Sequence, residues 1–128
     1  LGGLVFESLG VRSVSEMVPV VYEKGLPKFR IAAHAGLVQP AGDRGDAVAT
    51  ALLEEAALEL SLAARAVAQR LSLGAGPFRV VLAGGVFKAC PSLPTRIERC
   101  LGLPGAQLAP LSVEPAQGAV SLALDLLR

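Results

Sequence analysis

The sequence predicts an α/β fold that is rich in helices and has few strands. Of the 128 residues, 21 are Ala and 22 are Leu, whereas Phe, Tyr and Trp together make up only 4%. Ala and Leu are strong helix formers. A long helical pattern is followed by strand, helix, strand and helix patterns, an alternation typical of α/β domains. Because two strands do not make a sheet that helices can cover on both faces, we expect the other strands to lie in sequence absent from this chain.

Residues 1–42 are expected to form a helical lead-in. Two short helices are predicted over residues 3–9 and 14–23. Ser13 and Glu16 have the spacing of a capping box at the start of the second helix. The lead-in therefore contributes helices and no strand.

An apolar stretch, residues 31–38, is predicted to be a short helix or a buried turn that ends near Pro40. It contains His34, the single histidine of the chain. We interpret His34 as a half-buried structural residue. The alternative, a catalytic base, needs a nucleophile that the sequence does not show.

The clearest element is a long helix from Asp46 to about Leu71, within the segment 43–76. Asp43 or Asp46 is placed to accept its first free N–H groups. Apolar residues recur at three- and four-residue steps and predict one broad buried face: Ala49, Leu52, Leu53, Ala56, Leu60, Ala63, Val67 and Leu71. The polar face is expected to be solvated rather than to form an acid/base pair, and it carries Glu54, Glu55 and Glu59.

Residues 77–128 are expected to form a strand–helix–strand–helix unit. The first strand, residues 79–83, is apolar without alternation, which is typical of a strand buried on both faces of a parallel sheet. We therefore expect it to be the central strand. A helix from residue 91 or 92 to 101, a weaker strand over 107–109 and a final helix over 115–127 complete the unit.

Composition excludes several classes of protein. Twelve Lys and Arg against eleven Asp and Glu give a net charge of +1, and neither sign forms a block, which argues against binding to nucleic acid or an anionic membrane. The longest uncharged run, residues 100–113, is shorter than the roughly 18 residues of a membrane span. The start at Leu1 shows neither a secretory signal nor Met, so we expect a cut or trimmed chain. The mean hydropathy of +0.55 predicts exposed apolar surface or a homo-oligomer that hides it.

The two cysteines are expected to be reduced thiols of a cytoplasmic protein. Cys90 and Cys100 lie at opposite ends of a predicted helix, about 15 Å apart at 1.5 Å per residue, whereas a disulfide needs Cα atoms within about 7 Å. The alternative, a redox or cluster ligand, lacks a CxxC motif. Together with His34 they are too few for a zinc site, so we expect no metal bound by the thiols.

A glycine pair follows the first strand directly. In open α/β sheets, ligands bind beyond the carboxyl ends of the strands, and glycine lets the backbone approach a nucleotide without a Cβ in the way. Gly84 and Gly85 are therefore candidate nucleotide-binding residues, the alternative being a plain tight turn. Lys88 lies four residues past Gly84, where its ammonium group can meet a phosphate or a ribose.

Several segments resemble a known family in their order and spacing. They are Val20-Val21-Tyr22, Ile31-Ala32 leading through Val38 to Gly45-Asp46, then Ala49, Leu52-Leu53, Ala56-Ala57 and Leu60, then Val80-Val81-Leu82-Ala83-Gly84-Gly85-Val86-Phe87, and finally Pro115, Gly118-Ala119 and Ala123. Over nearly the whole chain they resemble the C-terminal half of the BadF/BadG/BcrA/BcrD ATPase family. This family includes N-acetylglucosamine kinases and belongs to the sugar kinase, actin and Hsp70 superfamily.

The resemblance implies a partial ribonuclease H-like (actin-like ATPase) domain with residues 77–128 on the nucleotide side. Gly84 and Gly85 are similar to the adenosine motif of the superfamily, with Val86 and Lys88 as further cofactor-binding residues. It also implies that Gly118-Ala119 lies in the final helix, packed behind that site. Pro40 departs from the pattern, because it interrupts a stretch that is usually helical in relatives.

The function that the resemblance implies is an ATP-dependent sugar kinase that uses Mg²⁺. The phosphate-binding hairpin and the metal-binding and catalytic aspartates of such kinases lie in the N-terminal half. This chain therefore needs that half as its partner, along with a small-molecule sugar, and is expected to be inactive alone. The alternative is an ATP-dependent activator or a sugar-responsive regulatory module without phosphotransfer. The family's activators carry an iron–sulfur cluster, which the spacing of Cys90 and Cys100 does not suggest.

Overall fold

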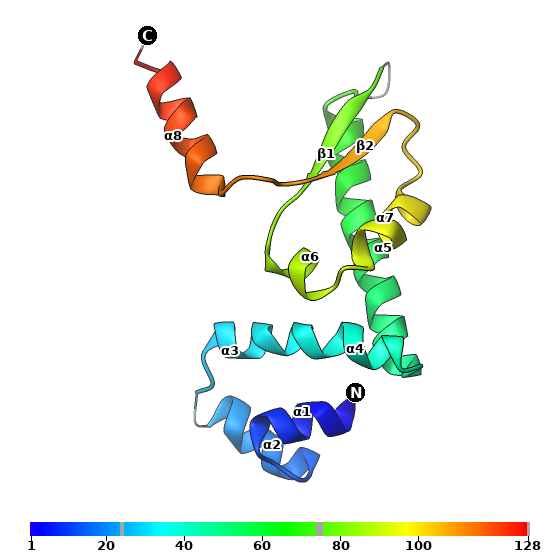
Figure 1. Ribbon diagram of the computed structural model, residues 1–128, viewed down its shortest axis with the longest axis vertical. Coiled ribbons are helices and arrows are strands. Elements are labelled where there is room, and N and C mark those ends of the chain that lie inside the picture. Colours follow the sequence, from blue (N-terminus) through cyan, green and yellow to red (C-terminus); the bar gives the residue numbers. More distant parts are fainter. Residues whose placement is uncertain (24, 74–75, 128) are drawn as a thin grey trace.

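The computed structural model describes residues 1–23, 25–73 and 76–127, and the fold is helix-rich α/β with a two-stranded parallel sheet (Figure 1). The first part contains α1 (Gly2–Leu9), α2 (Val14–Tyr22), α3 (Lys28–Ala33), the 3-10 helix η1 (His34–Leu37) and α4 (Val38–Asp43). The rest contains α5 (Ala47–Arg70), β1 (Phe78–Leu82), α6 (Gly85–Ala89), α7 (Leu93–Leu101), β2 (Ala106–Pro110) and α8 (Pro115–Asp125). The predicted elements occur in the expected order. The structure adds α6, and it has α3, η1 and α4 where one short helix or a buried turn was expected over residues 31–38.

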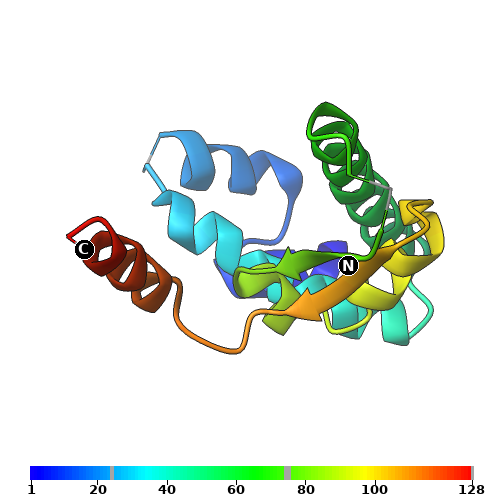
Figure 2. The ribbon, with the colours of Figure 1, turned by 90° about the horizontal axis from the view of Figure 1, so that it is seen from above.

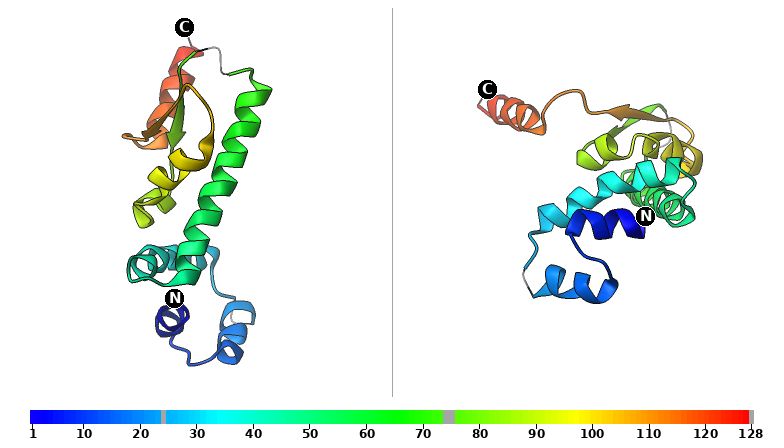
Figure 3. Two further views of the ribbon diagram at one scale, coloured as in Figure 1. Left: turned by 90° about the vertical axis from the view of Figure 1, so that its right-hand side faces the viewer. Right: turned by 60° about the horizontal axis from the view of Figure 1, so that its bottom comes forward.

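The sheet pairs β1 with β2 in parallel, from Phe78 opposite Ala106 to Leu82 opposite Pro110. Burial alternates along β1, and the covered face packs against α5 and α7, which lie on the same side of the strands (Figure 3). On the other face Val81 is 54% exposed. The expectation of a central strand buried on both faces is therefore wrong for this chain. Within the described residues no element covers the second face, and each strand has one neighbour.

The long helix α5 begins as expected, because Asp46 is its N-cap and accepts a hydrogen bond from the Ala49 N–H at 2.9 Å. Its buried face differs from the predicted one. The fully buried residues follow mainly four-residue steps: Ala49, Leu53, Ala57, Ser61 and Ala68. Predicted core residues that are instead exposed are Leu52, Leu60, Ala63, Val67 and Leu71. The buried stripe consists mostly of small side chains, because these let α7 pack closely on α5.

The core lies between α5, α7 and the sheet. Its buried members are Leu53, Ala57, Leu82, Cys90, Leu93, Ile97 and Leu101. At about 25 cal/mol per Å² of apolar surface, a fully buried Leu such as Leu93 contributes roughly 1.5–3 kcal/mol. Polar contacts also join the two helices, because the Ser61 hydroxyl lies 3.0 Å from the Cys100 sulfur.

The described part of the lead-in consists of helices joined by short turns, and α1 and α2 lie on the far side of the α3–α4 run from the sheet (Figures 1 and 3). Half of the predicted capping box is confirmed: the Ser13 hydroxyl accepts from the Glu16 N–H at 3.2 Å, but the Glu16 carboxylate accepts from the Arg12 N–H at 2.8 Å rather than from the N–H of Ser13. The apolar stretch does not end near Pro40, because α4 continues to Asp43. Pro40 is the third residue of α4, in the first turn, where the N–H that proline lacks has no helical partner to lose.

The last helix, α8, stands away from the rest of the chain at the end of an extended segment (Figures 1 and 2). Its residues are all exposed, and several are large and apolar, among them Val120, Leu122 and Leu124. The expected exposed apolar surface is thus present. No helix in the described part of the chain is long and apolar enough to cross a membrane.

Candidate functional site

The loop after β1 contains the two candidate glycines, and these have different backbone conformations. Gly84 is the N-cap of α6 with φ 116° and ψ 163°, a conformation that essentially only glycine adopts. Gly85 begins α6 without a positive φ, and a Cβ added to it would meet nothing within 4 Å. The turn therefore requires glycine at Gly84 and not at Gly85. Its missing side chain leaves open space beside the loop instead.

Helix α6 holds the loop against the core. Phe87 packs on the buried cluster, and the Cys90 N–H donates to the Val86 carbonyl at 2.8 Å. The Cys90 thiol is 3% exposed and donates to the Ala35 carbonyl of η1 at 3.6 Å. Burial raises the pKa of the Cys90 thiol, so this group stays protonated at neutral pH. The anchored side of α6 thereby fixes the position of Gly84 and Gly85.

The other side of α6 faces solvent. Val86 is 39% exposed, and Lys88 is exposed and has no ion-pair partner among the described residues. The four predicted site residues, which are neighbours in the sequence, lie in one short segment at the carboxyl end of β1. This end is where parallel α/β sheets bind their ligands. The segment offers a cation, an apolar contact and free space above a glycine backbone.

Two apolar hollows lie beside the free edge of β1. One of 260 Å³ reaches Ala83 and Phe87 next to the loop, and one of 350 Å³ continues toward Leu73. Both are lined by Ala64 of α5 and Val80 of β1. The loop is thus flanked by an apolar groove between the sheet edge and α5.

The expectation that Gly118-Ala119 packs behind the loop is not met. Both residues are exposed in α8, and a Cβ on Gly118 would meet nothing within 4 Å. The helix stands apart from α6 in Figures 1 and 2. These two residues therefore contribute nothing to the candidate site in this structure.

A polar network that the sequence reasoning missed joins α4, α5 and α7. Gln39 is 8% exposed, and its Oε1 accepts from the Ser92 N–H at 3.2 Å and from the Ser92 hydroxyl at 2.7 Å. Arg96 donates to the same hydroxyl at 3.1 Å and forms an ion pair with Glu54, which Arg99 also approaches at 3.4 Å. The place of Glu54 on the polar face of α5 predicts a solvated side chain. Instead, Glu54 forms ion pairs with Arg96 and Arg99. The one sequence signal was Ser92, a residue type common at helix starts.

The remaining candidates for chemistry are His34 and the two cysteines. His34 is half-buried, as expected, and its Nδ1 lies 2.8 Å from the Arg30 carbonyl. Both cysteines are free, as expected. Across the described ranges no group of three or more His, Cys, Asp or Glu side chains could hold a metal ion.

Comparison with known proteins shows a similarity to a sugar kinase. Over 125 residues the chain is 30% identical to an N-acetylmuramic acid/N-acetylglucosamine kinase from Clostridium acetobutylicum. The chain is related to a sugar kinase. The match covers 96% of the chain but 41% of that kinase. No family model and no solved structure matches the chain.

Proposed function

We propose that this chain is the adenosine-binding part of an ATP-dependent sugar kinase of the BadF/BadG/BcrA/BcrD ATPase family. The complete protein would transfer the γ-phosphoryl group of ATP to a hydroxyl of a hexose or amino sugar. The observation that carries this proposal is the match to a sugar kinase, which extends over 125 residues of the chain. The position of the glycine loop also supports the proposal, because α/β sheets bind nucleotides beyond the carboxyl ends of their strands.

The proposal includes a ribonuclease H-like sheet that the rest of the protein completes. Two features support it. The outer edge of β1 has no partner strand in the described chain, and the groove between that edge and α5 is apolar. A further strand from the rest of the protein would pair with this edge and fill the groove. The exposed face around Val81 would then be available for α8, whose apolar residues have no cover.

Each loop residue has a proposed role. Gly84 sets the turn, Gly85 leaves room for the purine or ribose, and Val86 gives an apolar contact. Lys88 places a positive charge toward the ribose or phosphates. ATP supplies the phosphoryl group, and catalysis in such kinases consists mainly of positioning and charge stabilisation. We assign the Mg²⁺ ligands, the catalytic carboxylate and the sugar contacts to the part of the protein outside this chain.

The competing class, an activator with an iron–sulfur cluster, finds no support in the cysteines. Cys90 is 3% exposed within the core, and the Cys100 sulfur bonds to Ser61 of α5. A phosphotransfer assay on the intact protein with ATP and amino sugars separates a kinase from a regulator that binds both without reaction.

The test of the site is calorimetric titration of ADP against the intact protein and its Gly85→Val variant. A side chain at Gly85 meets no protein atom, so the variant is expected to fold normally and to lose about tenfold or more in ADP affinity, which is roughly 1.4 kcal/mol. Sugar binding is expected to stay unchanged. Lys88→Ala is expected to have a smaller effect.

The matched control is Gly3→Val in α1, where a Cβ also meets nothing within 4 Å. It is expected to bind ADP as the wild type does. Circular dichroism of all variants excludes unfolding. If Gly85→Val retains wild-type ADP affinity, the loop is only a turn and the assignment fails.

A further inference from the structure

Among the described residues, no strand pairs with the outer edge of β2. The Phe78 N–H donates to the Gly105 carbonyl at 2.9 Å, and the Leu111 N–H donates to the Leu82 carbonyl at 2.9 Å. In a parallel ladder alternate residues bond to the same neighbour, so the odd-numbered residues from 105 to 111 face β1. Leu108 therefore directs its N–H and C=O away from β1, and so does the Ala106 C=O. No other described residue bonds to these three groups.

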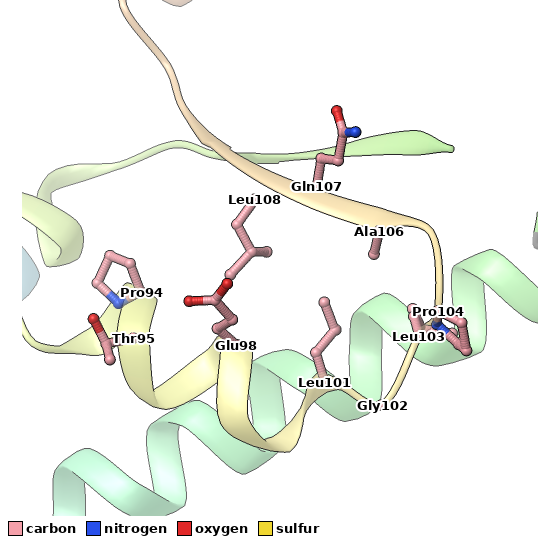
Figure 4. A pocket seen from close by; sticks show the side chains of 10 residues that line it. All are labelled: Pro94, Thr95, Glu98, Leu101, Gly102, Leu103, Pro104, Ala106, Gln107 and Leu108. Atoms are coloured by element: carbon pink, nitrogen blue, oxygen red, sulfur yellow. The ribbon is translucent and has the colours of Figure 1, made fainter. Parts of the chain in front are cut away.

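A groove of 810 Å³ runs between this edge and α7 (Figure 4). Leu101, Leu103 and Leu108 give it an apolar floor. The Glu98 carboxylate points into the space between α7 and β2 in Figure 4, and Thr95 lies one turn earlier on the same helix. Glu98 is exposed and has no ion-pair partner among the described residues. Among the described residues that line the groove, Glu98 is the single charged one.

We propose that this groove binds an extended peptide segment of a partner protein, which adds a strand to β2 and places a Lys or Arg side chain against Glu98. The three unpaired backbone groups supply hydrogen bonds that are independent of sequence, and the groove supplies selectivity, as in other cases of strand addition. Charge complementarity favours a basic side chain at this position, because Glu98 gives the groove a carboxylate that forms no ion pair with another described residue. The leucines favour apolar side chains two residues to either side, since alternate side chains of a strand share a face.

Pro110 limits the length of the added strand. It occupies the next outward-facing position of β2 after Leu108 and has no N–H to donate, so pairing is restricted to the first half of β2. This part of β2 is at its amino end, whereas the glycine loop follows the carboxyl end of β1. Because the strands are parallel, the groove and the loop lie at opposite ends of the sheet. The inference is therefore independent of the proposed kinase function.

The probe is the peptide acetyl-Val-Thr-Lys-Thr-Val-amide, titrated into the intact protein and followed by NMR. The expected result at millimolar peptide is shifts at Leu108, Ala106 and residues 98–103, with Gly84 and Gly85 unaffected. Glu98→Lys is expected to weaken binding about two- to tenfold, the range for loss and reversal of an exposed ion pair. The same variant should prefer the peptide with Glu in place of Lys. Glu59→Lys on α5, with the same change of charge, should bind as the wild type does.

Two N-methylated peptides test for an added strand. One is methylated at both Thr residues and the other at the Val and Lys residues, so each lacks the N–H groups of one edge. One of the two should lose binding while the other keeps it. Equal behaviour of the two peptides, or no shifts in the groove, would overturn the proposal. Shifts at Leu108 that depend on protein concentration without peptide would also overturn it, because they would assign the edge to a second copy of the chain.

Discussion

The Oε1 atom of Gln39 lies 2.7 Å from the hydroxyl of Ser92, 53 residues further along the chain. The Gln39 Nε2 group donates to Asp43 at 2.7 Å, which holds the side chain in place on α4. Ser92 is the N-cap residue of α7, and its hydroxyl also accepts from Arg96. One buried amide thus ties the helical lead-in to the start of the helix that covers the sheet.

Gln39→Ala should destabilise the protein by about 1–3 kcal/mol, because it leaves the Ser92 N–H and hydroxyl without their acceptor. The measurement is urea denaturation followed by circular dichroism. Gln69→Ala, at an exposed position of α5, is the control and should change stability by less than about 0.5 kcal/mol. Equal effects of the two substitutions would contradict the structural role of Gln39.

Leu52 and Leu53 test the orientation of α5. Leu53 is 2% exposed and Leu52 is 42% exposed. Leu53→Ala should cost about 2–5 kcal/mol, the range for a buried leucine, and Leu52→Ala should cost about 1 kcal/mol or less in this chain. Urea denaturation of both variants gives the comparison. A larger loss for Leu52→Ala would mean that the predicted face, not the observed one, is buried.

The sequence was sufficient to place most elements and insufficient to orient α5. Helix starts are readable because a cap such as Asp46 or Ser13 is a local signal. The buried face of α5 depends on which neighbour packs there, and α7 packs where small residues such as Ala57 permit close approach. Apolar residues occur on all sides of α5. The positions of apolar residues in the sequence therefore could not identify which stripe of the helix is buried.

The candidate loop was predictable for a similar reason. A glycine pair after an apolar strand is a local pattern, and Gly84 occupies the backbone conformation that such a turn requires. The different role of Gly85 depends on its backbone conformation and on the open space beside its Cα, and neither can be read from the sequence. Helix α6 was missed because its five residues are too few for a helical period. Gln39 was missed because its partner is distant in sequence.

Substitution by alanine should affect protein stability differently at Gly84 and at Gly85. Gly84→Ala forces a side chain into the glycine conformation at φ 116° and should cost about 1–3 kcal/mol. Gly85→Ala has open space and no positive φ, so its stability should equal that of the wild type or exceed it slightly, because alanine favours the helix. Thermal unfolding of both variants is the measurement. Equal destabilisation would show that both glycines are needed for the turn.

Cys90 should make stability depend on alkaline pH. Burial raises the pKa of its thiol above the ordinary 9.0, so the folded state retains the proton at pH values where the unfolded chain loses it. The contribution of the protonated Cys90 thiol to the free energy of unfolding is therefore fully present below pH 9.0. It falls as the pH rises through the higher pKa of the folded state. Urea midpoints measured from pH 8 upward should fall more steeply for the wild type than for Cys90→Ala. Parallel curves would contradict a buried, protonated thiol.

We propose that the loop at Gly84 and Gly85 binds the adenosine of ATP. The most direct measurement is a crystal structure of the intact protein with ADP bound. We expect the adenine or ribose to lie against the Gly85 Cα, in the space where a Cβ would meet no protein atom, with Lys88 at the rim of the site. An ADP molecule bound elsewhere, with the Gly84–Gly85 loop free of ligand, would contradict it.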